Sequence, residues 1–213
     1  MRRMAGRTKS WKVTSDETGL PGELEQKLAA GLAVADLLVT SGGVSMGELD
    51  LLQPLLARWG VVHFGRVLMK PGKPMTFATL HAQQADGAID PTQPAKPIFA
   101  LPGNPVSSLV TFQLFVRPAI RRMLGHQAVG LAQVRATLGH EFRLDPERPE
   151  FHRVSLCREG GRFVAVSTGS QASSSLLSAS GANGLLVLEQ AARVLPAGAE
   201  RPALLLDDAW LSG

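Results

Sequence analysis

Apolar residues in the first 125 positions occur either at helical spacing or in short continuous runs. Leucines recur at intervals of four over residues 24–35, which predicts a helix there. Residues 51–59 place leucines and a tryptophan on one helical face, but Pro54 fits best at a first helical position and leaves the start of this helix open. Short apolar runs are typical of buried strands. They predict strands at residues 36–40, 61–69, 75–80 and 97–101.

A proline- and asparagine-containing turn precedes the last helix of this half. Asn104 is placed to cap that helix, with Pro105 at its first position. Pro118 predicts a kink or a restart before the helix closes by Gly125. Strands that alternate with glycine-rich loops and helices predict an α/β fold, with a mostly parallel sheet and flanking helices. The pair of strands around residues 70–74 remains compatible with antiparallel pairing.

The pattern changes after Gly130, where apolar and polar residues alternate by twos. This alternation is typical of half-buried strands, and the two glycines within residues 159–162 predict a hairpin turn. Strands are predicted near residues 134–138, 151–155, 163–166, 185–188 and 203–206. We therefore expect an α/β domain at residues 14–126 and a small all-β domain at residues 130–213.

Composition narrows the classes of protein to consider. The chain is 45% apolar and 19% charged with a net charge of +4, as in ordinary soluble proteins. It has no block of basic residues with interleaved aromatics, so the sequence argues against nucleic-acid binding. Its single cysteine, Cys157, excludes a disulfide framework, and no apolar run reaches the roughly 20 residues of a membrane span. Residues 1–13 resemble a basic tail and not a secretory signal, so we expect a cytoplasmic protein.

The loop at residues 41–50 follows a predicted strand and combines three kinds of binding group. Its glycines would let backbone N–H groups approach an anion, its serines supply hydroxyl groups, and its carboxylates suit Mg²⁺, which bridges to phosphates. The groups belong to Ser41, Gly42, Gly43, Ser45, Glu48 and Asp50. A tight turn in which Asp50 caps the next helix explains the same pattern, so the loop alone leaves both interpretations open.

Two further loops also follow predicted strands. In the first, Lys70 and Lys73 flank a glycine between two prolines and form a rigid cationic corner, although a solvated turn is the plain alternative. The second loop leads into the start of a helix, whose N–H groups could bind an anion or could simply be capped by the chain itself. Its candidate residues are Gly103, Asn104 and Ser107. Open α/β sheets bind ligands at the carboxyl edge, so we expect all three loops to converge there.

These three loops, in this order and spacing, resemble the molybdopterin molybdotransferase family, which includes the C-terminal domain of gephyrin. The segments that carry the resemblance are residues 40–50, 69–74 and 101–107. Residues 149–154, 167–171 and 182–185 are similar to the family's C-terminal β-domain. The resemblance extends from about residue 14 to residue 213, whereas residues 1–13 match nothing in the family.

The resemblance implies a role in molybdenum cofactor biosynthesis. Family members insert molybdate into adenylylated molybdopterin with the help of Mg²⁺ and release AMP. By matching motif, Asp50 would be the essential carboxylate near the metal, and Glu48 a second metal ligand. Ser45, Lys70, Lys73 and Ser107 would hold molybdate or phosphate oxygens, while Ser41, Gly42, Gly43, Gly103 and Asn104 would complete the substrate site.

The sequence also departs from the family. Members are homodimers built by two further N-terminal domains, and their catalytic domain opens with a Ser/Thr-Gly-Asp-Glu-Leu loop and an Asp-Ser-Asn motif. None of these is found here, so the resemblance implies an incomplete, N-terminally truncated α/β domain and leaves open whether this chain alone is active. Two alternatives remain: a non-catalytic module that binds an anion or nucleotide, or an interaction module that binds a partner peptide.

Overall fold

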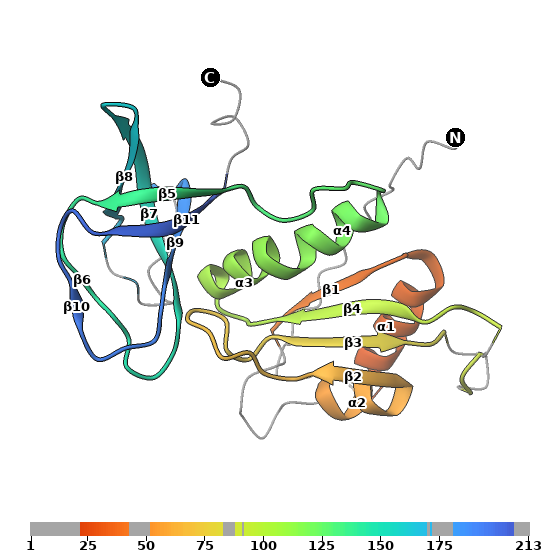
Figure 1. Cartoon of the computed structure of the whole chain (residues 1–213). Helices are drawn as coiled ribbons and strands as arrows, with labels where there is room; N and C mark the ends of the chain where they lie inside the picture. Colours follow the sequence, from red (N-terminus) through yellow and green to blue (C-terminus); the bar gives the residue numbers. More distant parts are fainter. Residues whose placement is uncertain are drawn as a thin grey trace.

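The computed structural model describes residues 22–42, 52–82, 88–90, 92–169, 171 and 181–206. Within these ranges the chain forms an α/β unit and a β-barrel that lie side by side (Figure 1). The fold class predicted from the sequence, an α/β domain followed by a small all-β domain, is confirmed. No helix among the described residues is long and apolar enough to cross a membrane.

The sheet of the α/β unit has four described strands in the order β1-β4-β3-β2. Their bounds are Leu38–Ser41 for β1, Gly60–Phe64 for β2, Thr76–Leu80 for β3 and Lys96–Leu101 for β4. β1 pairs in parallel with β4, whereas β3 is antiparallel to both β4 and β2. Three strands therefore share one direction, and only β3 is reversed. Residues 65–75 join β2 to β3 without the crossover helix that parallel neighbours need, so this pair is antiparallel.

The predicted strand at residues 61–69 was too long, because β2 ends at Phe64. The apolar residues that follow serve another purpose. Val67 and Met69 pack with Val110 of the helix above the sheet and with Leu185 of the barrel. Their hydrophobicity therefore reflects packing between the two units, which a pattern along the chain cannot distinguish from a buried strand.

Helices cover both faces of the sheet. On one face lie α1 (Glu23–Val34) and α2 (Leu52–Trp59), and on the other lie α3 (Pro105–Thr111), η1 (Phe112–Val116) and α4 (Arg117–Met123). The leucine repeat predicted to form the first helix places Leu28 and Leu32 in the core. Alternation along β4 divides the core: Ile98 and Ala100 face α1 and α2, whereas Phe99 and Leu101 face the other helices.

The helix that follows Asn104 changes its hydrogen-bond pattern halfway. The five-residue π-helical segment η1 separates α3 from α4, and Pro118 lies in the first turn of α4. Proline has no N–H group and cannot continue the ordinary ladder of an α-helix, so a wider turn before it is a physical solution. The predicted restart at Pro118 is confirmed.

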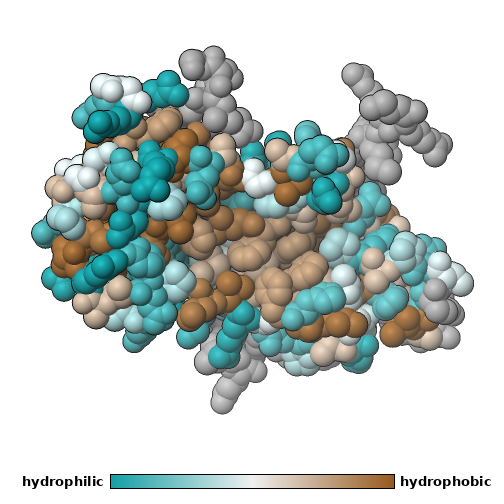
Figure 2. Space-filling view, viewed as in Figure 1, coloured by the Kyte–Doolittle hydropathy of each residue, from teal (hydrophilic) through white to brown (hydrophobic). Residues whose placement is uncertain are grey.

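The second unit is a closed barrel with strand order β11-β5-β8-β7-β9, beside a two-stranded pair of β6 and β10. The strands are β5 Gln133–Leu138, β6 Phe142–Arg143, β7 Glu150–Glu159, β8 Arg162–Ser167, β9 Gly184–Leu188, β10 Val194–Leu195 and β11 Glu200–Leu205. β7 and β8 form the predicted hairpin, and Gly160 and Gly161 both have positive φ, at 56° and 81°. That conformation suits the tight turn and favours glycine. On the face shown in Figure 2, apolar side chains gather in the hollow between the two units.

Candidate functional site

The carboxyl ends of β1 and β4 bring two of the three predicted loops into contact. The N–H of Gly42 donates to the carbonyl of Leu101 over 3.1 Å, and the Ser41 hydroxyl donates to the carbonyl of Pro102 over 3.4 Å. The Ser41 and Ser108 hydroxyl oxygens lie 3.3 Å apart. Because the two strands run in parallel, their carboxyl ends share one sheet edge, where ligands of open α/β sheets bind.

The start of α3 is capped by its own chain. The Asn104 side-chain oxygen accepts from the N–H groups of Val106 and Ser107, over 3.1 and 3.2 Å, and the N–H of Ser108 donates to the Asn104 carbonyl. Pro105 occupies the first helical position and has no N–H group. The predicted capping is therefore confirmed. An anion at this helix start would have to compete with Asn104 for the same donors.

The turn that carries the two lysines packs against α3. Gly72 has a φ of 113°, and a Cβ atom added there would lie only 2.5 Å from the Cγ2 atom of Thr111. The Thr111 hydroxyl in turn donates to the Ser107 carbonyl over 2.8 Å. The lysine turn thus approaches the element that begins with the third loop. Because β1, β2 and β4 run in one direction, the described residues of the three loops follow strand ends at one edge of the sheet, and the convergence of the complete loops stays a prediction.

Four predicted site residues lie outside the described residues: Gly43, Ser45, Glu48 and Asp50. They include both proposed carboxylate ligands of Mg²⁺. In the part of the chain that the structure describes, no group of three or more His, Cys, Asp or Glu side chains could hold a metal ion. The metal site therefore stays a prediction that rests on the sequence of this loop.

The two lysines of the turn differ in their surroundings. Lys73 is exposed and forms no ion pair with a carboxylate in the described ranges. The Lys70 ammonium lies 3.2 Å from the Asp145 carboxylate and 3.3 Å from the Glu150 carboxylate, both in the β-barrel unit. Sequence reasoning treated the lysines alike and missed both acidic partners. Glu150 had appeared only within a segment similar to the family's β-domain.

Glu150 also begins a chain of polar contacts inside the barrel. Its second carboxylate oxygen lies 3.0 Å from Nδ1 of His152, and Nε2 of His152 lies 2.9 Å from the Ser167 hydroxyl. Burial opposes ionisation of Glu150, but the hydrogen bond and charge of His152, with the charge of Lys70, outweigh burial and lower its pKa. The N–H of Glu147 is the largest influence that lowers the pKa of Asp145, and Lys70 adds to it.

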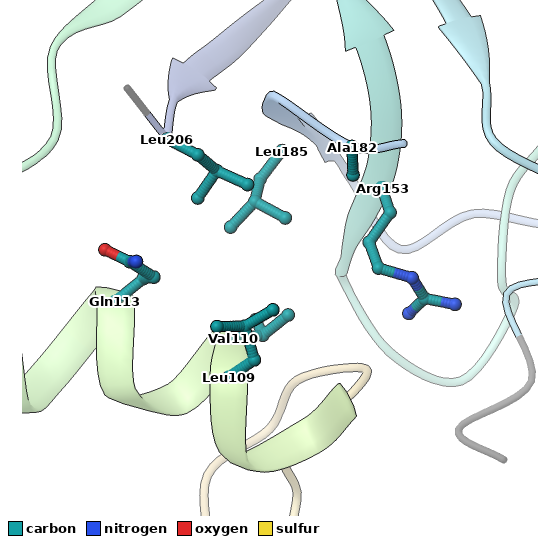
Figure 3. A pocket seen from close by; sticks show the side chains of 7 residues that line it. All are labelled: Leu109, Val110, Gln113, Arg153, Ala182, Leu185 and Leu206. Carbon is teal, nitrogen blue, oxygen red and sulfur yellow. The ribbon is translucent and has the colours of Figure 1, made fainter. Parts of the chain in front are cut away.

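A small pocket lies between α3 and the barrel (Figure 3). Its lining residues are Leu109, Val110, Gln113, Arg153, Ala182, Leu185 and Leu206. Leucine and valine side chains from the two units face each other, while the Arg153 side chain extends to one side (Figure 3). Arg153 is buried, and this burial lowers its pKa because it penalises the charged form. The sequence analysis did not single out this arginine.

Each of the two units matches a known family model. Residues 4–122 match the model described as "Probable molybdopterin binding domain", and residues 135–206 match "MoeA C-terminal region (domain IV)". The chain belongs to the MoeA and gephyrin family of molybdotransferases. The first match begins at residue 4 and so includes most of the segment that we expected to match nothing in the family.

Individual relatives agree with this assignment. The chain is 46% identical to "Gephyrin" of Dictyostelium discoideum over 81% of its own length and 26% of that protein. It is 36% identical to "Molybdopterin molybdenumtransferase" of a Nostoc species, over 79% of its own length and 37% of that protein. The chain thus spans well under half the length of these curated relatives.

Solved structures support the fold. The crystal structure of the "molybdopterin biosynthesis moea protein" from Pyrococcus horikosii superposes with a TM-score of 0.61 at 26% identity. The match covers 86% of this chain and 40% of that one. It extends over most of the chain, so the arrangement of an α/β unit and a barrel has a known counterpart.

Proposed function

We propose that this chain acts in molybdenum cofactor biosynthesis, by inserting molybdate into adenylylated molybdopterin with release of AMP. The observation that carries the proposal is the contact between the loops after β1 and β4, with the lysine turn packed against α3. This edge offers hydroxyl groups, glycine backbone and the exposed Lys73 ammonium to a substrate that bears phosphates and to molybdate, which is an anion. Membership in this family supports the choice of this reaction for such a site.

The lysine that suits direct contact with the substrate is Lys73. Its ammonium is exposed, and no described carboxylate competes for it. Ser41 lies at the same edge, where the backbones of Gly42 and Gly103 approach each other closely, and Ser107 lies buried in the first turn of α3. We propose that these residues, with Gly43, Ser45 and Asn104, bind the phosphate and molybdate oxygens.

We further propose that Asp50, with Glu48 as a second ligand, holds Mg²⁺ beside the substrate. A bound Mg²⁺ would neutralise charge on the phosphate oxygens and so make cleavage of the adenylate easier. Asp50 has the shorter side chain and lies at the end of the glycine loop, where a carboxylate could serve the metal. Members of the family form homodimers, and we propose the same for this protein.

Release of AMP tests the reaction. The purified chain is incubated with adenylylated molybdopterin, Mg²⁺ and molybdate, and AMP is quantified over time. We expect molybdate-dependent release that Asp50→Asn abolishes with little change in melting temperature, because the amide keeps the shape but loses the charge a metal needs. If the unmodified chain and Asp50→Asn both bind AMP tightly but neither forms AMP from adenylylated molybdopterin, the result would instead support a non-catalytic nucleotide-binding module.

Binding of the product AMP or of the substrate molybdate provides a second measurement. Titration calorimetry with AMP or molybdate should show affinity weakened by about 1–3 kcal/mol in Lys73→Ala, the usual scale for losing a hydrogen bond to a charged group. Lys96→Ala is a suitable control because the Lys96 ammonium donates to the Leu32 carbonyl at the start of β4, the strand end opposite the proposed site. Equal affinities of the Lys73 variant and the unmodified chain would remove Lys73 from the site.

A further inference from the structure

The backbone of Lys70 is joined directly to the barrel unit. Its N–H donates to the Pro149 carbonyl over 3.0 Å, and its carbonyl accepts from the N–H of Phe151 over 2.8 Å. These two bonds form an isolated parallel bridge between Lys70 and Glu150. A residue of the proposed anion loop thus extends the edge of a barrel strand.

The side chain of Lys70 strengthens this joint. Its ammonium lies between two carboxylates, and both are well shielded: the side chains of Glu150 and Asp145 are 5% and 13% exposed. Each carboxylate is also fixed by other contacts, Glu150 by His152, and Asp145 by the N–H groups of Glu147 and Arg148. Partly buried pairs of this kind are screened less by solvent and salt than surface pairs.

The residues on either side of Lys70 are fixed as well. Met69 is buried with Val110 of α3 and Leu185 of the barrel, and Gly72 fits closely against Thr111 of α3. Lys73 follows one residue after this closely packed glycine and is exposed. The barrel therefore holds one end of a short rigid turn whose other end presents the exposed lysine.

We propose that Lys70 is a positioning residue and not an anion ligand, and that Asp145 and Glu150 hold it so that Lys73 is correctly presented at the anion site. This inference rests on the proposed function. It reassigns one of the two lysines that the sequence placed in the site. It also gives the barrel a specific task, which is to set the geometry of a loop in the α/β unit.

Charge supports the reassignment. Two carboxylates within 3.3 Å more than neutralise the single ammonium of Lys70, so an anion drawn to this lysine would also meet their negative charge. Lys73 has no such neighbours among the described residues. Among the described residues, Lys73 therefore offers an anion a cation without a flanking carboxylate, whereas Lys70 does not.

The test compares Glu150→Gln, Lys70→Gln and the double variant by calorimetric titration of the full chain with molybdate and, separately, AMP. Positioning predicts that each single change weakens binding roughly three- to tenfold and that the double variant is no weaker than either, because both remove the same interaction. If Lys70 were a ligand, Glu150→Gln would free its ammonium and tighten binding. Tightened or unchanged binding in Glu150→Gln overturns the proposal.

A second readout does not depend on any ligand. Hydrogen exchange of the amides of Gly72, Lys73 and Met75 should accelerate in Glu150→Gln and Lys70→Gln, but remain as in the unmodified chain in Lys70→Arg, which keeps the charge. Glu189→Gln is the matched control: it removes another barrel carboxylate, which pairs with Arg193 and Arg201 and not with Lys70. Unchanged exchange in both uncharged variants overturns the positioning role. Faster exchange in a chain that binds neither anion supports positioning and counts only against the proposed function.

Discussion

Gly42 and Gly103 bring the backbones of two loops almost into contact, since a Cβ atom added at Gly103 would lie 3.3 Å from the Cα atom of Gly42. The two residues follow β1 and β4, which pair in parallel up to Ser41 and Leu101. Any larger residue at position 103 would push the loops apart by a few tenths of an ångström. The width of the proposed anion site is therefore set by two residues without side chains.

Alanine substitutions at these glycines should differ in cost. Gly42 has a φ of 90°, where any side chain is strained, so Gly42→Ala should lower the free energy of unfolding by about 1–2 kcal/mol. Gly103→Ala should cost less than about 1 kcal/mol, because only a slight shift is needed. Gly130→Ala, with open space and no positive φ, serves as the control. Urea unfolding measures all three, and an equal cost for Gly42→Ala and Gly130→Ala would contradict this account.

Gly72 should be the least replaceable residue of the lysine turn. An alanine there combines a φ of 113° with a contact of 2.5 Å to the Thr111 methyl group, so Gly72→Ala should destabilise the protein by more than about 2 kcal/mol. Thr111→Ser removes that methyl group and keeps the hydroxyl that donates to Ser107. Combining the two substitutions should recover part of the loss in urea unfolding. No recovery would show that backbone strain alone sets the cost.

Asn104 allows capping and anion binding to be separated. Asn104→Ala removes the acceptor for two N–H groups and should cost about 1 kcal/mol of stability. Asn104→Asp preserves the cap and hence the melting temperature. Its added negative charge at the proposed site should nevertheless weaken molybdate binding in calorimetry. If the aspartate variant binds molybdate as well as the unmodified chain, the anion does not lie near this helix start.

Secondary-structure elements could be predicted from the sequence better than contacts between residues that are distant along the chain. Helical spacing located Leu28 and Leu32 in the core, and turn chemistry located the Asn104 cap, because both depend on neighbours along the chain. The extent of β2 and the role of Lys70 depend on contacts with the barrel, from residues more than seventy positions away. No local sequence pattern distinguishes a lysine that forms ion pairs with two carboxylates from a lysine that is available to bind an anion.

A carboxylate on the barrel should make stability depend on pH in the acid range. Glu189 pairs with Arg201 and Arg193, and these hydrogen bonds, the one from Arg201 foremost, lower its pKa to about 2 from an ordinary value of 4.5. A depressed pKa contributes stability that is fully present above the ordinary value and is lost as pH falls through the folded one. The window therefore runs from about pH 4.5 down to about pH 2.

Glu189→Gln tests this window. The variant should melt below the unmodified chain at pH 7, and the gap should narrow as the pH is lowered from 4.5 towards 2. The effect should be modest and should shrink in 1 M salt, because the Glu189 side chain is 40% exposed and its pairs are screened. Glu141→Gln, at an exposed carboxylate without an ion pair among the described residues, should show no gap at any pH. A gap in the Glu189 variant that stays constant down to pH 2 would mean that lost packing, and not lost charge, causes the destabilisation.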